Sequence, residues 1–319
     1  MIFRLLVALA VLMVAQGLEL NHNDFSAIQK AKKMDPLSFN TTESVHLGES
    51  ASRYENDPFG YSTLYHSEVA YCVDTDYMSR DYNTNSYTKS FVPTLYVHSD
   101  NTQQSVRGYI GYQPSINAII VSFRGSEDLA NWVTNLDAVR MNYGKCSGCS
   151  VHEGFYKAEQ GVYSTVYDEV SRLVNEYPSY QIVVTGHSLG AALATLTALD
   201  LVGDFGSKVN LYNYGCPRLF NQAAADWSSS GVLNIGARRT HYKDIVVHSP
   251  PYAMGFRHTD GEIYENGPSS NWPFFPGGPL QDCVGEEDDS CADQFDIGSI
   301  SDHLLYSGFV MGTNGCDQL

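Results

Sequence analysis

The chain has 319 residues, of which 17% are charged and 12% aromatic, and its 36 acidic residues outnumber 19 basic ones to give a formal net charge of −17. This length allows a sizeable buried core. The acidity excludes nucleic acid and anionic membrane surfaces as partners, because too few cations are present to neutralise phosphates, and it is typical of a soluble secreted protein.

The first residues predict a leader rather than a membrane anchor. Residues 1–17 carry one arginine near the start, an apolar run from Leu5 to Ala15, and small residues suited to cleavage. This run is too short to span a bilayer, so we predict a signal peptide and an extracellular protein without a stable membrane anchor. Residues 18–55 are polar, lack sustained periodicity and contain the glycosylation sequon at Asn40, which indicates a propeptide or a loose arm.

Export would place the seven cysteines in an oxidising compartment, where an odd number leaves at least one without a partner in the chain. The candidate pairs are two short-range ones and one that would join the two ends of the domain, namely Cys146–Cys149, Cys283–Cys291 and Cys72–Cys316. A zinc or redox site at the C-x-x-C pair is disfavoured, since there is no second C-x-x-C and no histidine at ligand spacing. We therefore expect no metal.

Residues 56–319 contain no linker and no repeat, which predicts a single domain. Its expected elements are, in chain order, strands at 90–99, 106–112 and 117–125, a helix at 155–177, a strand at 181–186, a helix at 189–202, a strand at 210–215, a helix at 220–227 and a strand at 237–242. The first two strands look antiparallel, and the alternation after them predicts an α/β fold with a mostly parallel sheet covered on both faces.

A serine stands at a sharp corner in "IVVTGHSLGAALATL". Gly186, Ser188 and Gly190 fit the G-x-S-x-G pattern, with a buried strand before it and a helix after it. Small neighbours let strand and helix pack closely, and the helix N-terminus favours negative charge that develops nearby. The alternative is a serine that only caps the helix, but this context favours a nucleophile.

A serine nucleophile needs a histidine base and an acid that orients it, and in α/β-hydrolases the chain order is serine, acid, histidine. Asp244 follows the strand at 237–242, where a parallel strand meets its loop. His248 lies too close to Asp244 and is interpreted as a local structural residue. His258, in a segment interpreted as a hairpin, and His303, near the C-terminus, remain equal candidates for the base.

The segment "VSFRGSEDLANWVTNLD" follows the first buried strand. Ser126 lies after a strand–glycine corner, where an oxyanion donor is needed. Leu129, Trp132, Val133 and Leu136 recur on one face of a short helix. This helix is either an ordinary part of the wall or a lid that opens at an oil surface; exposing three large apolar side chains to water would cost about 5–9 kcal/mol.

Four segments resemble the class 3 lipases, the extracellular triacylglycerol lipases of filamentous fungi and yeasts. They are "SFRGSEDLANWVTNL", "VHEGFYKAEQGVYSTVYDEVSRLVNEYPSYQIVVTGHSLGAALATL", "YKDIVVHSPP" and "DHLLYSGF". The resemblance covers residues 56–317 and implies an α/β-hydrolase fold with a short helical lid. The chain departs from the usual family pattern at Gly190-Ala191, where relatives have two glycines, and at the acidic pair Glu127-Asp128.

The resemblance also implies site residues. Ser188, Asp244 and His303 match the family's catalytic triad, which decides between His258 and His303. Ser126 and the backbone N–H of Leu189 match its oxyanion hole.

The helix that contains Leu129, Trp132 and Val133 matches the family's lid. The three cysteine pairs resemble family disulfides, which leaves Cys216 as a free thiol.

The function implied by the resemblance is a secreted triacylglycerol lipase that hydrolyses acylglycerols at an oil–water interface through an acyl-enzyme, without a metal or an organic cofactor. The alternatives are a phospholipase A1 or a feruloyl or other carboxylesterase on the same scaffold, and, from a different class, a binding protein on an inactive hydrolase fold. The sequence does not identify partner proteins.

Overall fold

A computed structural model describes most of the expected domain. The described residues are 54, 57–72, 80–100, 105–268, 278–295 and 298–316. The expected signal peptide at 1–17 and the sequon at Asn40 lie outside them, as does the arm at 18–55 apart from Tyr54. Tyr54 is buried, and its hydroxyl donates to the carbonyl of Gly60 at 2.9 Å. The packed part of the chain therefore includes a residue that the sequence placed in the arm.

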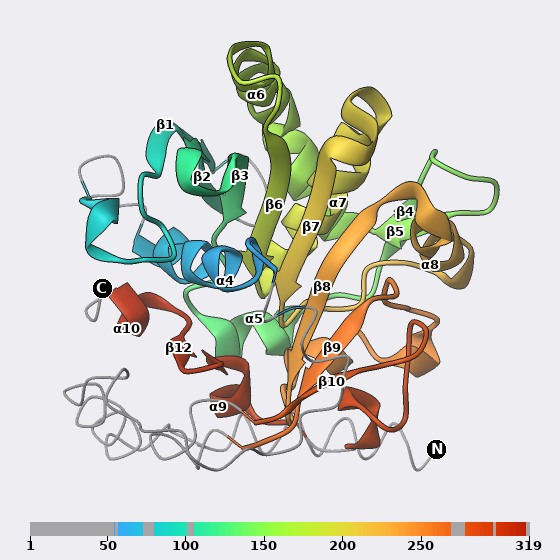
Figure 1. Ribbon diagram of the computed structural model, residues 1–319. Coiled ribbons are helices and arrows are strands. Elements are labelled where there is room, and N and C mark those ends of the chain that lie inside the picture. Colours follow the sequence, from blue (N-terminus) through green and yellow to red (C-terminus); the bar gives the residue numbers. More distant parts are fainter. Residues whose placement is uncertain are drawn as a thin grey trace.

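One eight-stranded sheet forms the centre of the molecule (Figure 1). Its strands, in spatial order, are β1 (Val92–Ser99), β2 (Val106–Gln113), β3 (Ala118–Phe123), β6 (Gln181–His187), β7 (Val209–Tyr214), β8 (Asn234–His241), β9 (Glu262–Glu265) and β10 (Leu280–Asp282). Neighbouring strands run parallel from β3 to β9 and antiparallel at both edges. This confirms the predicted α/β fold with a mostly parallel central sheet.

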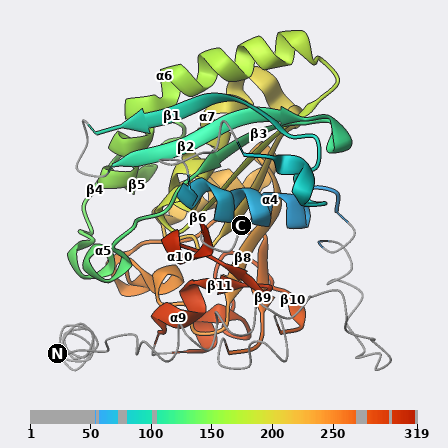
Figure 2. The same ribbon diagram turned by 90° about the vertical axis from the view of Figure 1, so that its left-hand side faces the viewer.

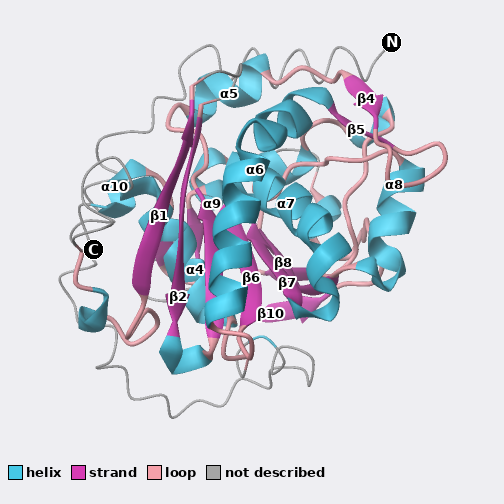
Figure 3. Cartoon of the chain, turned by 90° about the horizontal axis from the view of Figure 1, so that it is seen from above, coloured by secondary structure: helices cyan, strands magenta, loops and turns pink. Residues whose placement is uncertain are grey.

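Helices cover both faces of this sheet. Figure 2 shows α6 (Glu153–Glu176) on one side and α4 (Gly60–Val69) on the other, and Figure 3 shows α7 (Leu189–Phe205) beside α6. Shorter elements complete the described fold: α5 (Leu129–Asn135), β4 (Arg140–Asn142), β5 (Ser150–His152), α8 (Gln222–Trp227), α9 (Ile300–His303), β11 (Leu305–Tyr306), β12 (Phe309–Val310) and α10 (Thr313–Cys316).

The central strands are apolar throughout because both of their faces are buried. In β3, Ile119 and Val121 pack into the core under α6 and α7, whereas Ile120 between them packs into the core under α4. The apolar stripe predicted for α6 faces the sheet, and the helix ends just before Pro178. Sequence periodicity thus predicted the layers correctly.

The hairpin expected around His258 is wrong. The segment that follows His258 forms β9, which pairs in parallel with β8 and antiparallel with β10. Upstream of β9, Arg257 pairs with Phe220 instead. The segment expected to fold back on itself therefore pairs with β8, β10 and Phe220, none of which lies within it, so its local pattern carried no signal for these partners.

Within the described residues, one helical stretch, Leu189–Lys208, is long and apolar enough to cross a membrane. Most of it is buried inside the protein, where it forms the core helix α7 next to β6 and β7. Its composition is therefore explained by the packing of α7 in the centre of the fold.

The cysteines are paired as the spacing suggested. Disulfides join Cys72 to Cys316, Cys146 to Cys149 and Cys283 to Cys291, and Cys216 is a buried free thiol. The first of these bridges links the end of the α4 region to α10 at the far end of the sequence.

Candidate active site

The predicted nucleophile lies on a tight turn between β6 and α7. Ser188 has φ +61° and ψ −127°, a combination that a residue with a side chain adopts only under strain. A methyl group on Gly186 would overlap the carbonyl of Gly190, and one on Gly190 would overlap the carbonyl of Phe123. The two glycines of the pattern therefore allow the strand, the turn and the helix to approach as closely as they do.

The predicted acid and base are in direct contact. Nδ1 of His303 donates to Oδ2 of Asp244 at 2.7 Å, and both side chains are fully buried. The same carboxylate accepts the hydroxyl of Tyr306 at 2.6 Å and the backbone N–H of Val246 at 2.7 Å. Burial alone would raise the pKa of Asp244, but His303 and the hydroxyl of Tyr306 outweigh it and lower the pKa, so this acid is ionised.

The hydrogen bond to Asp244 decides which nitrogen of His303 is free to react. Because Nδ1 carries the proton, Nε2 of a neutral His303 has an open lone pair. Among the described residues, neither Nε2 of His303 nor Oγ of Ser188 has a hydrogen-bond partner, and both atoms are buried. A methyl group on Gly215 would lie 2.7 Å from Cε1 of His303, so this glycine leaves room for the ring.

The residues predicted for an oxyanion hole come from the residue after Ser188 and from the loop after β3. Leu189 is the first residue of α7, so its N–H has no acceptor within the helix. Ser126 follows Gly125, and a methyl group on Gly125 would lie 2.9 Å from Cβ of Ser188. The loop after β3 therefore packs directly against the turn that carries Ser188.

Helix α5 places its apolar face against the protein. Leu129 is only 8% exposed, Val133 is half-buried, and the half-buried side chains of Trp132 and Leu136 pack against the main core. The Trp132 ring stacks on Phe155 with ring centres 6.0 Å apart. With Ser188 only 1% exposed, the site is closed to solvent in this arrangement.

A buried histidine connects the segment after α5 to the body of the protein. Nε2 of His152 donates to the carbonyl of Asp137 at 2.7 Å, and Nδ1 accepts the N–H of Phe155 at the start of α6. The ring of His152 also stacks on that of Phe155 with 4.0 Å between centres. Burial lowers the pKa of His152, which keeps this connection neutral.

Three further residues support the site, and the sequence analysis did not identify them. Tyr306 bonds to Asp244, as described above. His187 precedes Ser188, and its Nδ1 lies 2.7 Å from the hydroxyl of Tyr71. His187 stands within the G-x-S-x-G pattern and Tyr306 three positions after His303, so motif proximity was the only available signal; nothing marked Tyr71.

The other histidines considered for the base lie elsewhere. His258 is buried, with Nε2 2.8 Å from the carbonyl of Val247, and its backbone N–H donates to Glu287. His248 faces Asp293, with Nδ1 3.4 Å from the carboxylate. Within the described residues, neither His248 nor His258 makes a side-chain hydrogen bond to Asp244.

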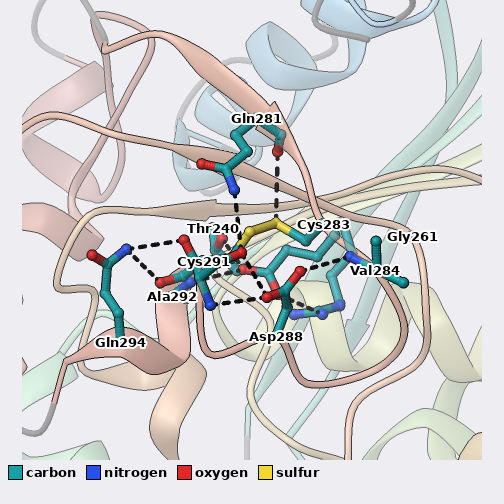
Figure 4. Close-up of a disulfide and its surroundings, with 12 residues drawn as sticks. Thr240, Gly261, Gln281, Cys283, Val284, Asp288, Cys291, Ala292 and Gln294 are labelled. Carbon is teal, nitrogen blue, oxygen red and sulfur yellow. Dashed lines mark hydrogen bonds and ion pairs between the residues drawn. A yellow bond between two sulfur atoms is a disulfide. The ribbon is translucent and has the colours of Figure 1, made fainter.

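In the described part of the chain, one group of side chains has the spacing of a metal site. Glu262, Cys283 and Cys291 place their ligand atoms within 4.8 Å of one another. The two sulfurs form a disulfide, as Figure 4 shows, so neither is available as a thiolate ligand. The carboxylate of Glu262 accepts hydrogen bonds from Thr240 and Arg238. This cluster is explained as a structural support of β9.

Comparison with known proteins relates this geometry to one group of enzymes. Residues 120–254 match the family model for lipase (class 3). A secreted mono- and diacylglycerol lipase A of Penicillium cyclopium is 33% identical over 227 residues, which cover 69% of this chain and 73% of the relative.

Solved structures give the same result. The lipase of Rhizopus microsporus var. chinensis superposes with a TM-score of 0.73 at 27% identity, covering 88% of this chain and 95% of that one. A triacylglycerol lipase whose catalytic centre is described as a serine protease triad superposes with a TM-score of 0.67 at 28% identity, covering 82% and 96%.

Proposed function

We propose that this chain, which belongs to the class 3 lipase family, is a secreted triacylglycerol lipase acting through Ser188, His303 and Asp244. Membership of the family makes the chain a serine ester hydrolase. The choice of residues is supported above all by one observation, the buried contact between His303 and Asp244 beside a serine held on a strained turn.

The proposed reaction uses these groups in sequence. Nε2 of His303 takes the proton of Ser188 as Oγ attacks the ester carbonyl, and the resulting imidazolium then protonates the leaving alcohol. Asp244 remains ionised, keeps the Nδ1–H tautomer of His303 and stabilises the imidazolium. Water then hydrolyses the acyl-enzyme with His303 as the base, which regenerates Ser188.

The backbone N–H of Leu189 and Ser126 are proposed to stabilise the negative charge that develops on the ester oxygen. Leu189 follows Ser188, Ser126 follows the glycine that packs against Ser188, and the N-terminal end of α7 adds a favourable dipole. Residues that donate to an oxyanion in a buried site are effective because water does not screen them.

Helix α5 is proposed to be a lid that is closed in water. Leu129 is buried, Trp132 packs against the core and Val133 is half-buried, so opening would expose apolar surface at a cost that an oil surface would remove. The lid hypothesis therefore predicts low activity on dissolved ester and high activity on droplets.

The first experiment measures initial rate against concentration of a medium-chain triglyceride, through its solubility limit, with Ser188→Ala as the blank. A sharp rise once droplets form, with residual rates in the variant, is expected. Smooth saturation below the limit without a further rise would identify an esterase for which α5 is part of the wall. Equal rates in parent and variant would remove Ser188 from the mechanism.

A second candidate substrate class comes from the Penicillium relative, which is described as a mono- and diacylglycerol lipase. Initial rates on mono-, di- and triglycerides of one acyl chain, all presented as emulsions, decide between the two. Phospholipid vesicles and a feruloylated sugar in the same assay test for a phospholipase A1 and for a feruloyl or other carboxylesterase. Higher rates on either of these would replace the triglyceride proposal.

Residues 1–17 are proposed to be the signal peptide, 18–55 an N-terminal arm or propeptide, and 56–319 the lipase domain. The relative's description as secreted and the three disulfides support an extracellular location. N-terminal sequencing of the protein recovered from culture medium locates the mature terminus.

A further inference from the structure

We propose that Tyr71 and His187 are positioning residues, which fix the base His303 relative to the nucleophile Ser188 and to the loop that carries Ser126. This inference rests on the proposed function. It concerns two consecutive hydrogen bonds, from Tyr71 to His187 and from His187 to the backbone of His303, and the packing of Tyr71 against the loop after β3.

The first link joins His187 to the base. Nε2 of His187 lies 2.8 Å from the backbone carbonyl of His303, and the two ring centres are 4.2 Å apart. A carbonyl oxygen only accepts, so Nε2 of His187 carries the proton. His303 is therefore fixed at two points, its side chain by Asp244 and its backbone by His187.

The second link sets the tautomer of His187. With the proton on Nε2, Nδ1 is an acceptor, and the hydroxyl of Tyr71 donates to it at 2.7 Å. His187 is fully buried, and burial lowers its pKa well below the ordinary value, so it stays neutral. A neutral ring is required here, because a second cation 4.2 Å away would oppose the imidazolium that forms on His303.

The third link reaches the oxyanion loop. A methyl group on Gly125 would overlap the hydroxyl of Tyr71, which shows how closely the two pack. Burial raises the pKa of Tyr71, and the charge of Arg124 lowers it only in part, so the hydroxyl keeps its proton and can donate. The Tyr71 hydroxyl thus packs against the residue before Ser126 and donates to the residue before Ser188.

The chain of donors has one consistent direction. It runs from Tyr71 to His187 and from His187 to the carbonyl of His303. Without the Tyr71 hydroxyl, the proton of His187 is free to move to Nδ1, which would turn the lone pair of Nε2 toward the carbonyl of His303. The base would then shift relative to Ser188 while the fold remained intact.

The test uses Tyr71→Phe, with Tyr109→Phe as its matched control. Tyr109 is also a buried tyrosine whose hydroxyl bonds to the Nδ1 of a buried histidine, His66, at 2.7 Å, but this pair lies outside the site. Both variants lose a tyrosine–histidine hydrogen bond, and Tyr109→Phe also loses the bond from its hydroxyl to the carbonyl of His66 at 3.0 Å, so its melting temperature is expected to fall at least as much as that of Tyr71→Phe. Only Tyr71→Phe is expected to lower kcat, by about tenfold with KM unchanged.

A second pair of variants tests the link to His303. His187→Gln keeps an N–H donor near the position of Nε2, whereas His187→Leu has none, so kcat is expected to be higher for the glutamine variant. Adding Tyr71→Phe to His187→Gln should cost little more, because the two residues act in series.

Each alternative result is decisive. Equal kcat in parent and Tyr71→Phe, or equal losses in Tyr71→Phe and Tyr109→Phe, overturns the positioning role. Labelling of Ser188 by a fluorophosphonate separates failure of the positioning role from failure of the proposed function. A parent protein that is neither labelled nor active on any ester refutes the lipase mechanism itself.

Discussion

Two buried carboxylic acids have pKa values shifted in opposite directions, and each shift has a local cause. Asp244 receives hydrogen bonds from His303 and Tyr306, which keep it ionised. Glu159 on α6 is buried near Asp200, and burial followed by that negative charge raises its pKa to about 8. The difference lies in what faces each acid, since both are removed from water.

The shift of Glu159 predicts how stability depends on pH. The folded protein keeps this proton up to about pH 8, whereas the unfolded chain releases it near 4.5. The contribution to stability is therefore fully present below pH 4.5 and is lost as the pH rises through 8. Glu159→Gln, which stays neutral, should unfold at a higher temperature than the parent above pH 8 and show a flatter profile from pH 5 to 8.

A carboxylate on the same helix provides the control. Glu169 pairs with Arg172 at 2.7 Å, and this hydrogen bond lowers its pKa, so Glu169→Gln should give no gain at alkaline pH. Melting temperatures of the parent and both variants across pH 4–9 check the prediction. A Glu159→Gln profile parallel to that of the parent would contradict it.

At the scale of single elements, the position of α5 depends on contacts with one neighbouring part of the fold. Its inner face rests on Phe155 through Trp132, and the segment after it is held by the hydrogen bond from His152 to the carbonyl of Asp137. Both contacts lead to the start of α6, so one rigid helix end supports the proposed lid from two sides.

Removing this hydrogen bond should favour lid opening. His152→Phe keeps a ring to stack on Phe155 but loses the donor to Asp137, which is worth about 1 kcal/mol and hence about fivefold in the open population. The rate on dissolved ester should rise several-fold, and the increase at the solubility limit should shrink.

His152→Gln, which retains an N–H donor, is the comparison and should stay closer to the parent. As a control, both variants must hydrolyse a saturating emulsion at the same rate as the parent, because this shows that the triad is intact. If His152→Phe leaves the rate on dissolved ester unchanged, the bond to Asp137 does not hold the lid.

For the molecule as a whole, the Cys72–Cys316 disulfide joins regions that are 244 residues apart in the chain. Cys72 follows α4, which covers one face of the sheet, and Cys316 ends α10, after the segment that carries His303. The bridge therefore links the C-terminal segment of the site to the end of a helix that lies near the N-terminal side of the domain.

Loss of this bridge should reduce stability far more than loss of the short Cys283–Cys291 bridge, whose separation is 8 residues. Loop entropy in the unfolded chain gives about 5 kcal/mol for the long loop and about 2.5 kcal/mol for the short one. Urea unfolding of Cys72→Ser/Cys316→Ser and Cys283→Ser/Cys291→Ser tests the order. Equal losses, or a larger loss for the short loop, would contradict the entropic argument.

The sequence by itself determined the layers of this fold and the turn that carries Ser188. Periodicity of apolar residues decides which segments become strands and helices, because each must bury one or both faces, and glycines around a serine fix the close approach of β6 and α7. The place of Asp244 after a predicted parallel strand indicated this residue as the acid, whereas chain order left His258 and His303 equal until the resemblance to class 3 lipases favoured His303.

Only the tertiary structure decided which residues surround the reacting groups. Tyr71 and His187 are 116 residues apart, and their contact depends on how α4 packs against β6. The partners of β9 and the connection from His152 to Asp137 likewise follow from packing. Hydrogen-bond partners brought together by folding leave no periodic pattern in the chain, so local sequence predicts the elements and the nucleophile but not the contacts that orient them.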